Sequence, residues 1–166
     1  MTISQSRCTA HHEAAHAVIY LHFGIEVEQV TLCRDEAGLC SVANDLLPSE
    51  GRLLAILAGP AADQVLLKAD PNALRSRESG WKLDYERAAE VSLLLGRGES
   101  IDAARIEAAK LVNEKWRIIC SLAELWICAS EENFAAGDPQ YIMNGYEVKS
   151  LVGKFSVART ASPGVP

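Results

Sequence analysis

The spacing of apolar side chains near the start of the chain predicts a helix followed by two short strands. Residues 7–23 carry apolar side chains at helical spacing, and Gly24 marks the end of this run. Residues 27–33 alternate between apolar and polar in the manner of a half-buried strand. A turn at 35–38 leads to a second expected strand near 39–44, so the pattern predicts a small hairpin or sheet beside the first helix.

Further along the chain, the pattern is helical over most positions. Ser49 precedes an expected helix that runs to about residue 68 and is broken or bent at Pro60, because proline lacks the backbone donor. The polar stretch 69–80 predicts a mobile loop that could gate a cleft. Two helices are expected at 83–95 and 100–133, and a last short helix follows.

Length and composition fit one folded domain of the mostly α (α+β) class. The chain has 166 residues, of which 49% are hydrophobic, and this is ample for a single core. Trp116 and Trp126 stand on a helically spaced apolar stripe, which predicts a core or oligomer contact. The formal net charge of −6 and the lack of a basic stripe argue against a nucleic-acid or anionic-membrane binder.

The run His12-Glu13-Ala14-Ala15-His16 is the stretch that predicts a specific chemistry. On a helix, two residues four positions apart lie about 40° apart around the axis and about 6 Å apart along it, so both imidazoles can hold one metal ion. Glu13 can direct its carboxylate at a water in the open coordination position, where zinc lowers the pKa of water to roughly 7. The motif therefore predicts a zinc-dependent hydrolase with Glu13 as general base.

The third protein ligand is not determined by the local pattern. His22 has the spacing of the metzincin motif, but Ile19 stands where the chain would need a glycine to turn back. His11 is adjacent to His12 and points elsewhere, so we expect packing or surface roles for His11 and His22. A carboxylate is the expected third ligand, and periodicity alone does not choose among Asp63, Asp70, Glu78, Asp84 and Glu86.

Four segments resemble the FtsH-type zinc peptidase domain. The run Thr9-Ala10-His11-His12-Glu13-Ala14-Ala15-His16-Ala17-Val18 resembles the opening of that domain. Leu57-Ala58-Gly59-Pro60-Ala61-Ala62-Asp63 is similar to its Ala-Gly-Arg-Ala-Ala-Glu-Glu helix. Leu83-Asp84-Tyr85-Glu86-Arg87-Ala88 is similar to its Asn-Asp-Leu-x-x-Ala-Thr segment, whose Asp is the third zinc ligand. Glu147-Val148-Lys149-Ser150-Leu151-Val152 is similar to the helix that closes the domain.

The resemblance implies both a fold and a site. It implies a zincin-like helical peptidase domain over residues 1–156. The sequence that follows, 157–166, is expected to be a disordered tail. It makes His12, His16 and Asp84 the ligands of a Zn²⁺ cofactor and Glu13 the catalytic base. The implied activity is that of a zinc metalloendopeptidase acting on unfolded or flexible polypeptides, like the proteolytic domain of the ATP-dependent FtsH proteases.

The chain departs from the family pattern at several positions. Pro60 replaces a characteristic Arg, and Trp81, Lys82 and Leu83 replace small residues that precede the ligand Asp. Asp63 replaces a Glu; it can accept a hydrogen bond from a ligand histidine, although an exposed helix carboxylate is the expected reading. Asp84 itself could act as a helix cap rather than a ligand.

Other features bear on the setting and the partners. Five cysteines without a C-x-x-C pair indicate reduced thiols in a cytoplasmic protein. The sequence has no G-x-x-x-x-G-K-S/T phosphate loop and no apolar run of roughly 18 residues or more, so we expect a soluble chain with no membrane span and no ATPase module of its own. A separate ATPase partner and a homo-oligomer are both open, since FtsH-type domains assemble in rings with an ATPase.

Two other readings of the same motif stay open. The chain could be a non-catalytic or regulatory FtsH-like module that docks to a separate ATPase or protease, although a pure scaffold has no physical need for the HExxH triplet. It could also be a gene-regulatory peptidase that cuts one repressor and is inert towards generic substrates.

Overall fold

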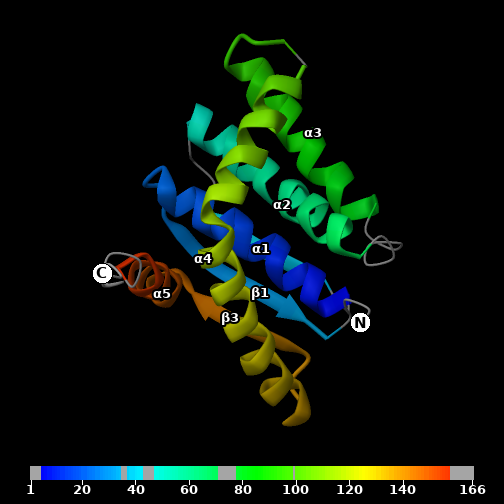
Figure 1. Cartoon of the computed structure of the whole chain (residues 1–166), viewed down its shortest axis with the longest axis vertical. Helices are drawn as coiled ribbons and strands as arrows, with labels where there is room; N and C mark the ends of the chain where they lie inside the picture. Colours follow the sequence, from blue (N-terminus) through cyan, green and yellow to red (C-terminus); the bar gives the residue numbers. More distant parts are fainter. Residues whose placement is uncertain (1–4, 35–36, 43–46, 71–77, 99, 158–166) are drawn as a thin grey trace, which may run out of the picture.

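The computed structural model describes residues 5–34, 37–42, 47–70, 78–98 and 100–157 (Figure 1). Its helices and strands are α1 (Gln5–His22), β1 (Val27–Cys33), β2 (Gly38–Val42), α2 (Glu50–Ala69), α3 (Glu78–Leu94), α4 (Asp102–Ala135), β3 (Gln140–Asn144) and α5 (Gly145–Val157). The expected fold class, mostly α with a small sheet beside the HExxH helix, is confirmed. The predicted tail lies outside the described residues except for Val157, which ends α5, and parts of the expected turn, second strand and gating loop lie outside them as well. Among the described helices, none is both long enough and apolar enough to cross a bilayer.

The sheet has three antiparallel strands in the order β2-β1-β3. Val30 in the central strand pairs with Cys40 on one side and with Met143 on the other. The sequence predicts the β1–β2 hairpin but not β3. This strand is only five residues long, with one buried side chain, so it lacks a readable alternation and forms because β1 offers it a free edge.

Helix α1 lies at the centre of the molecule, between α2, α4 and the sheet (Figure 1). Every residue from 8 to 20 is buried, around the whole circumference of the helix. A helix buried on all sides is expected to be apolar throughout, because a buried polar group must find a partner. Thr9, His11, His12, Glu13 and His16 are nevertheless polar, so the centre of the fold contains a polar cluster that packing alone does not explain.

Of the break or bend expected at Pro60, the break is wrong, because helix α2 continues past this residue to Ala69. Ser49 caps its N-terminus by accepting a hydrogen bond from the backbone N–H of Arg52, at 3.1 Å. Pro60 cannot donate to the carbonyl of Ile56, yet the buried side chains on both sides of it hold the helix against α1.

Helix α3 begins at Glu78, five residues earlier than expected. Asp84 therefore lies inside the helix rather than at its start, and the reading of Asp84 as a helix cap is wrong. The break after α3 is as predicted, with Gly96 and Gly98 both at a φ of 74°. In α4, Trp126 is fully buried and donates from its indole N–H to the sulfur of Met143, which confirms its role in the core.

Candidate metal centre

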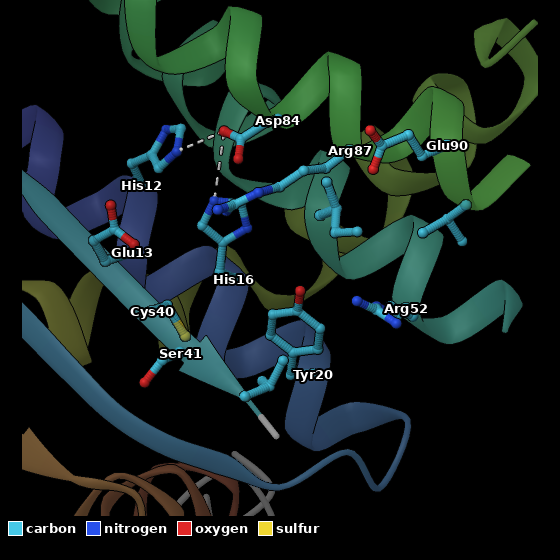
Figure 2. Close-up of a pocket in the computed structure, with 13 residues that line it drawn as sticks. His12, Glu13, His16, Tyr20, Cys40, Ser41, Arg52, Asp84, Arg87 and Glu90 are labelled. Atoms are coloured by element: carbon cyan, nitrogen blue, oxygen red, sulfur yellow. Dashed lines mark hydrogen bonds and ion pairs between the residues drawn. The ribbon is translucent and has the colours of Figure 1, made fainter. Parts of the chain in front are cut away.

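The HExxH motif lies on α1 and faces a cavity of about 360 Å³. The cavity lies between α1, the edge strand β2 and the helices α2 and α3 (Figure 2). His12, Glu13 and His16 all line it, as helical spacing predicts. The rings of His12 and His16 stand edge to face, with their centroids 4.7 Å apart.

Asp84 reaches the two histidines from α3. Its Oδ2 atom is 3.0 Å from Nε2 of His12 and 3.7 Å from Nε2 of His16. The three side chains are buried, and each offers a ligand atom within 4.8 Å of the others. The structure thus brings together the three residues that the resemblance implies as ligands. Two of the other candidate acids lie elsewhere: Asp70 is the C-cap residue that follows α2, and Glu86 is exposed beside Lys82.

Hydrogen bonds on the far side of each ring fix the orientation of the histidines. Nδ1 of His16 donates to the backbone carbonyl of Ala55 at 2.8 Å, since a carbonyl oxygen can only accept. Nδ1 of His12 donates to Oδ2 of Asp63, also at 2.8 Å. In the neutral rings Nε2 therefore carries the lone pair, and both Nε2 atoms face Asp84. This is the arrangement that metal-binding histidines require.

Asp63 is fully buried, so the expectation of an exposed helix carboxylate is wrong. Its Oδ2 atom also accepts a hydrogen bond from the indole N–H of Trp81, at 2.7 Å. Trp81 is a residue that sequence reasoning missed, since the sequence alone shows it only as a departure from the family pattern. Its signal was the substitution itself, a large donor where small residues are usual. Trp81 thus orients Asp63, and Asp63 orients the His12 ring through Nδ1, on the side of the ring opposite Asp84.

Gly59 of α2 leaves space beside both Nε2 atoms. A Cβ atom at position 59 would lie 2.5 Å from Nε2 of His12 and closer still to Nε2 of His16, so any side chain there would collide with both rings. The space that such a side chain would fill is next to the two nitrogens that would bind a metal. The residues present therefore fit a metal ion, and Gly59 is a second residue whose role the sequence pattern did not reveal.

The electrostatics of the cluster also favour a cation. Burial disfavours the charged form of His12, but the carboxylates of Asp63 and Asp84 outweigh it and raise the pKa of His12 to about 10. Burial likewise opposes ionisation of Asp84, yet His16 and His12 hold the pKa of that carboxyl well below its usual range. With neutral imidazoles, the buried carboxylates of Asp63, Asp84 and Glu13 would leave an excess of negative charge that a divalent ion can balance.

The remaining histidines lie outside this cluster, as expected. His11 is buried, donates from Nδ1 to the carbonyl of Arg7 at 2.8 Å, and packs against Trp116 with ring centroids 5.7 Å apart. His22 is exposed at the end of α1, against Phe23. Neither belongs to the metal-ligating group found among the described residues.

No protein-family model matches this chain, and no curated protein matches it either. The relation to FtsH-type peptidases therefore stays a prediction based on the four segments quoted above.

Proposed function

We propose that the chain is a zinc-dependent metallopeptidase that hydrolyses polypeptides. The observation that carries the proposal is the convergence of His12, His16 and Asp84, with ligand atoms within 4.8 Å of one another, on a cavity that Glu13 also lines. Two imidazole nitrogens and one carboxylate oxygen form a donor set that zinc accepts in catalytic sites, where a fourth position stays open. The hydrogen bonds from Asp63 and Ala55 add the outer support that such a site needs.

The chain's own residues supply the proton transfers. A zinc ion held by His12, His16 and Asp84 would act as a Lewis acid, polarising an amide carbonyl and acidifying water. Glu13 follows His12 directly on α1 and lines the same cavity, so its carboxylate can take a proton from the attacking water. The same carboxyl can then give that proton to the leaving amide nitrogen. Because Glu13 is buried, this exchange is shielded from bulk solvent.

Strand β2 suggests how a polypeptide would lie in the site. It is an edge strand of the described sheet, and its residues Cys40, Ser41 and Val42 line the cavity. An extended chain can add to such an edge through main-chain hydrogen bonds, which do not depend on its sequence. Gly38 brings this strand close to the proposed base, since a Cβ atom there would lie 2.7 Å from Oε1 of Glu13. This favours unfolded or flexible polypeptides as substrates.

We place this activity in the cytoplasm, where five unpatterned cysteines would stay reduced. A separate ATPase that unfolds substrates and self-association of the chain both belong to the same proposal, as the FtsH-type resemblance implies them.

Zinc content and cleavage of casein, measured together with and without a chelator, test the proposal. We expect about one zinc per chain and proteolysis that the chelator stops. Glu13→Gln should retain the zinc and lower turnover by about 10²-fold to 10⁴-fold, the usual contribution of a general base. Glu114→Gln, at an exposed position of α4, is the matched control. Cleavage by Glu13→Gln at the full rate would contradict the assigned base, and bound zinc with no cleavage of any polypeptide would favour the non-catalytic reading.

A further inference from the structure

Two hydrogen-bond donors, Tyr20 and Arg87, line the cavity beside the candidate metal centre. Tyr20 lies on α1 one turn after His16, so both side chains leave the same face of that helix. Arg87 lies on α3 one turn after Asp84. Two separate helices thus direct a donor into the same space, and the proton transfers of the proposed hydrolysis involve neither of them.

The hydroxyl of Tyr20 faces the cavity rather than a partner in the protein. Tyr20 is only 6% exposed, and Figure 2 shows its hydroxyl pointing into the space between His16 and Arg52. No hydrogen bond joins this hydroxyl to another described residue. Burial raises the pKa of Tyr20, so the phenol keeps its proton at neutral pH and is a donor. Because buried polar groups are nearly always hydrogen-bonded, we expect this hydroxyl to bind a group that enters the cavity.

The guanidinium group of Arg87 reaches back along α3 towards the candidate metal centre. Side chains of a helix lean towards its N-terminus, so Arg87 covers the turn that carries Asp84. Figure 2 shows the guanidinium extending towards His16 and Asp84. In the described part of the chain Arg87 forms no ion pair, since Asp84 pairs with the ligand histidines and Glu86 with Lys82. Its donors therefore remain accessible from the cavity.

The lining of the cavity is not a site for a permanent anion. Its charged groups are two guanidinium groups and three carboxylates, and the carboxylates belong to Glu13, Asp84 and Glu90. One of the two guanidinium groups, that of Arg52, is already engaged in another interaction. An anion would thus meet like charges, whereas a neutral acceptor such as a peptide carbonyl could accept hydrogen bonds from Tyr20 and Arg87 without that repulsion.

A polypeptide on the edge of β2 would bring such a carbonyl to the two donors. Strand β2 lines the cavity from one side and α3 from the other, and α1 lies between them (Figure 2). An extended chain beside β2 would therefore pass over His16 and Tyr20 of α1, with Arg87 facing it from α3. The carbonyl that lies at the metal centre is the one whose bond would be cleaved.

We propose that Tyr20 and Arg87 donate hydrogen bonds to the carbonyl oxygen of the peptide bond that is cleaved, and stabilise the negative charge that develops on this oxygen. The proposal rests on the proposed peptidase function and adds two catalytic residues to it. Donors that are fixed in place before the reaction and meet the full charge only in the transition state increase kcat more than they increase affinity for the substrate.

The two residues keep their own protons throughout the reaction. The oxygen of water adds to the carbonyl carbon, Glu13 takes a proton from the water, and the π-electron pair of the carbonyl moves onto its oxygen. Tyr20 and Arg87 hydrogen-bond to this oxyanion. The carbon–nitrogen bond then breaks as the carbonyl re-forms, and the nitrogen keeps the bonding pair and takes the proton from Glu13. The products are an amine and a carboxylic acid.

Kinetics of the zinc-loaded chain on an internally quenched casein peptide test the assignment. Tyr20→Phe and Arg87→Gln should each lower kcat by about a hundredfold and change KM by less than about threefold. Arg87→Lys should recover part of the loss, since lysine still donates. Tyr146→Phe and Arg117→Gln, at exposed positions outside the cavity, are the matched controls and should cleave at the full rate.

Zinc affinity, measured by calorimetry, separates a donor from a residue that only supports a ligand. Tyr20→Phe should bind zinc as tightly as the unmodified chain, within about twofold, because its hydroxyl contacts no described ligand. Arg87→Gln should bind zinc at least as tightly, because it removes a positive charge near the ion. A fall in zinc affinity as large as the fall in kcat would make Arg87 a support for Asp84 and overturn its assignment.

Binding of a tetrahedral analogue separates the two donors from the peptidase function. The probes are acetylated, amidated tetra-alanine and the same peptide with a phosphinic group in place of its central amide, both added to the zinc-loaded Glu13→Gln variant. Adding Tyr20→Phe or Arg87→Gln should weaken binding of the phosphinic peptide by about tenfold to a hundredfold and leave binding of the amide unchanged.

The outcomes differ for the two proposals. A loss confined to the phosphinic peptide supports the donors, even if the unmodified chain cleaves nothing and the proposed function fails. Equal cleavage rates in the unmodified chain and in both variants would leave the peptidase standing and overturn the donors. Equal losses for both probes, or no binding of the phosphinic peptide before the donors are removed, would overturn them as well.

Discussion

The two sides of the candidate metal centre differ in how firmly the fold holds them. His12 and His16 belong to α1, which is buried on all sides and packs against α2, α4 and the sheet. Asp84 belongs to α3, which lies at the outer edge of the molecule with α2 between it and α1 (Figure 1). Among the described residues α3 packs mainly on α2, and Leu93 and Leu94 near its end are exposed.

This difference indicates how the site is assembled. The α1–α2 side supplies two oriented imidazoles, their hydrogen-bond partners Asp63 and Ala55, and the open space beside Gly59. The α3 side supplies one carboxylate from a peripheral helix. A metal ion would thus connect the preformed pair His12 and His16 to the peripheral helix α3. Its binding should therefore stabilise α3 more than α1.

Gly59→Ala should have the largest effect, because it damages the preformed side directly. The added Cβ would collide with Nε2 of both His12 and His16, so we expect zinc affinity to fall by roughly a hundredfold or more, beyond what loss of an outer hydrogen bond causes. Zinc titration by calorimetry measures it. Gly153→Ala in α5 is the control, since nothing lies within 4 Å of a Cβ there and alanine favours a helix. Equal zinc affinity in the two variants would show that Gly59 does not border the metal.

Asp63→Asn should weaken the same side less. It removes the carboxylate that orients His12 but leaves both ligands and the cavity, so a loss of about tenfold to a hundredfold in zinc affinity is expected. Trp81→Phe, which removes the indole N–H that donates to Asp63, should cost less than Asp63→Asn. If Trp81→Phe lowered zinc affinity more than Asp63→Asn, Asp63 would not be the residue that orients the His12 ring.

Zinc affinity should also depend on pH through His12. In the metal-free chain the carboxylates of Asp63 and Asp84 raise the pKa of His12 to about 10 despite its burial, so zinc must displace a proton. Because one proton is released, the apparent affinity should rise about tenfold per pH unit between about pH 6.5 and 8. Asp84 adds no slope there, since its pKa is held well below the usual range. A flat profile would mean that His12 is neutral without metal.

The raised pKa of His12 also makes the stability of the metal-free fold depend on pH. His12 binds its proton more tightly in the folded chain than in the unfolded one, where the ordinary value of 6.5 applies. Its contribution is therefore complete below pH 6.5 and is lost as the pH rises towards 10. Urea unfolding of the metal-free chain across this window should show a falling midpoint.

Hydrogen exchange should show the smallest and most local effect. At short labelling times α1 should stay protected with or without zinc, whereas the amides of α3 should exchange and then slow on addition of metal. With free zinc at about ten times its Kd, the slowing should be about tenfold. If zinc slowed exchange in α1 as much as in α3, the proposal that α1 is already held firmly without metal would be contradicted.

The sequence predicts the parts of the fold that depend on local patterns and misses those that depend on tertiary contacts. The HExxH spacing and the alternation of 27–33 are local, so α1 and β1 could be predicted closely. Strand β3 was missed because a five-residue strand becomes stable only when β1 pairs with it. Proline at position 60 predicts a break or a bend, but α2 does not break there, because packing against α1 outweighs the lost backbone bond.

The site divides in the same way. Helical geometry alone places His12, Glu13 and His16 together, whereas the local pattern left five acids open as the third ligand. Asp84 was chosen by resemblance, and the structure places it beside both histidines from a helix far along the chain. Asp63 and Trp81 could not be assigned, since a buried carboxylate and an exposed one have the same letter in a sequence and only tertiary contacts separate them.

Anomalous diffraction at the zinc absorption edge, from crystals of the zinc-loaded chain, tests the central claim most directly. The account predicts a single strong peak about 2.0–2.2 Å from Nε2 of His12, Nε2 of His16 and a carboxylate oxygen of Asp84. A peak that touches the two histidines while Asp84 stays away from it, or no peak in the cavity at all, would contradict it.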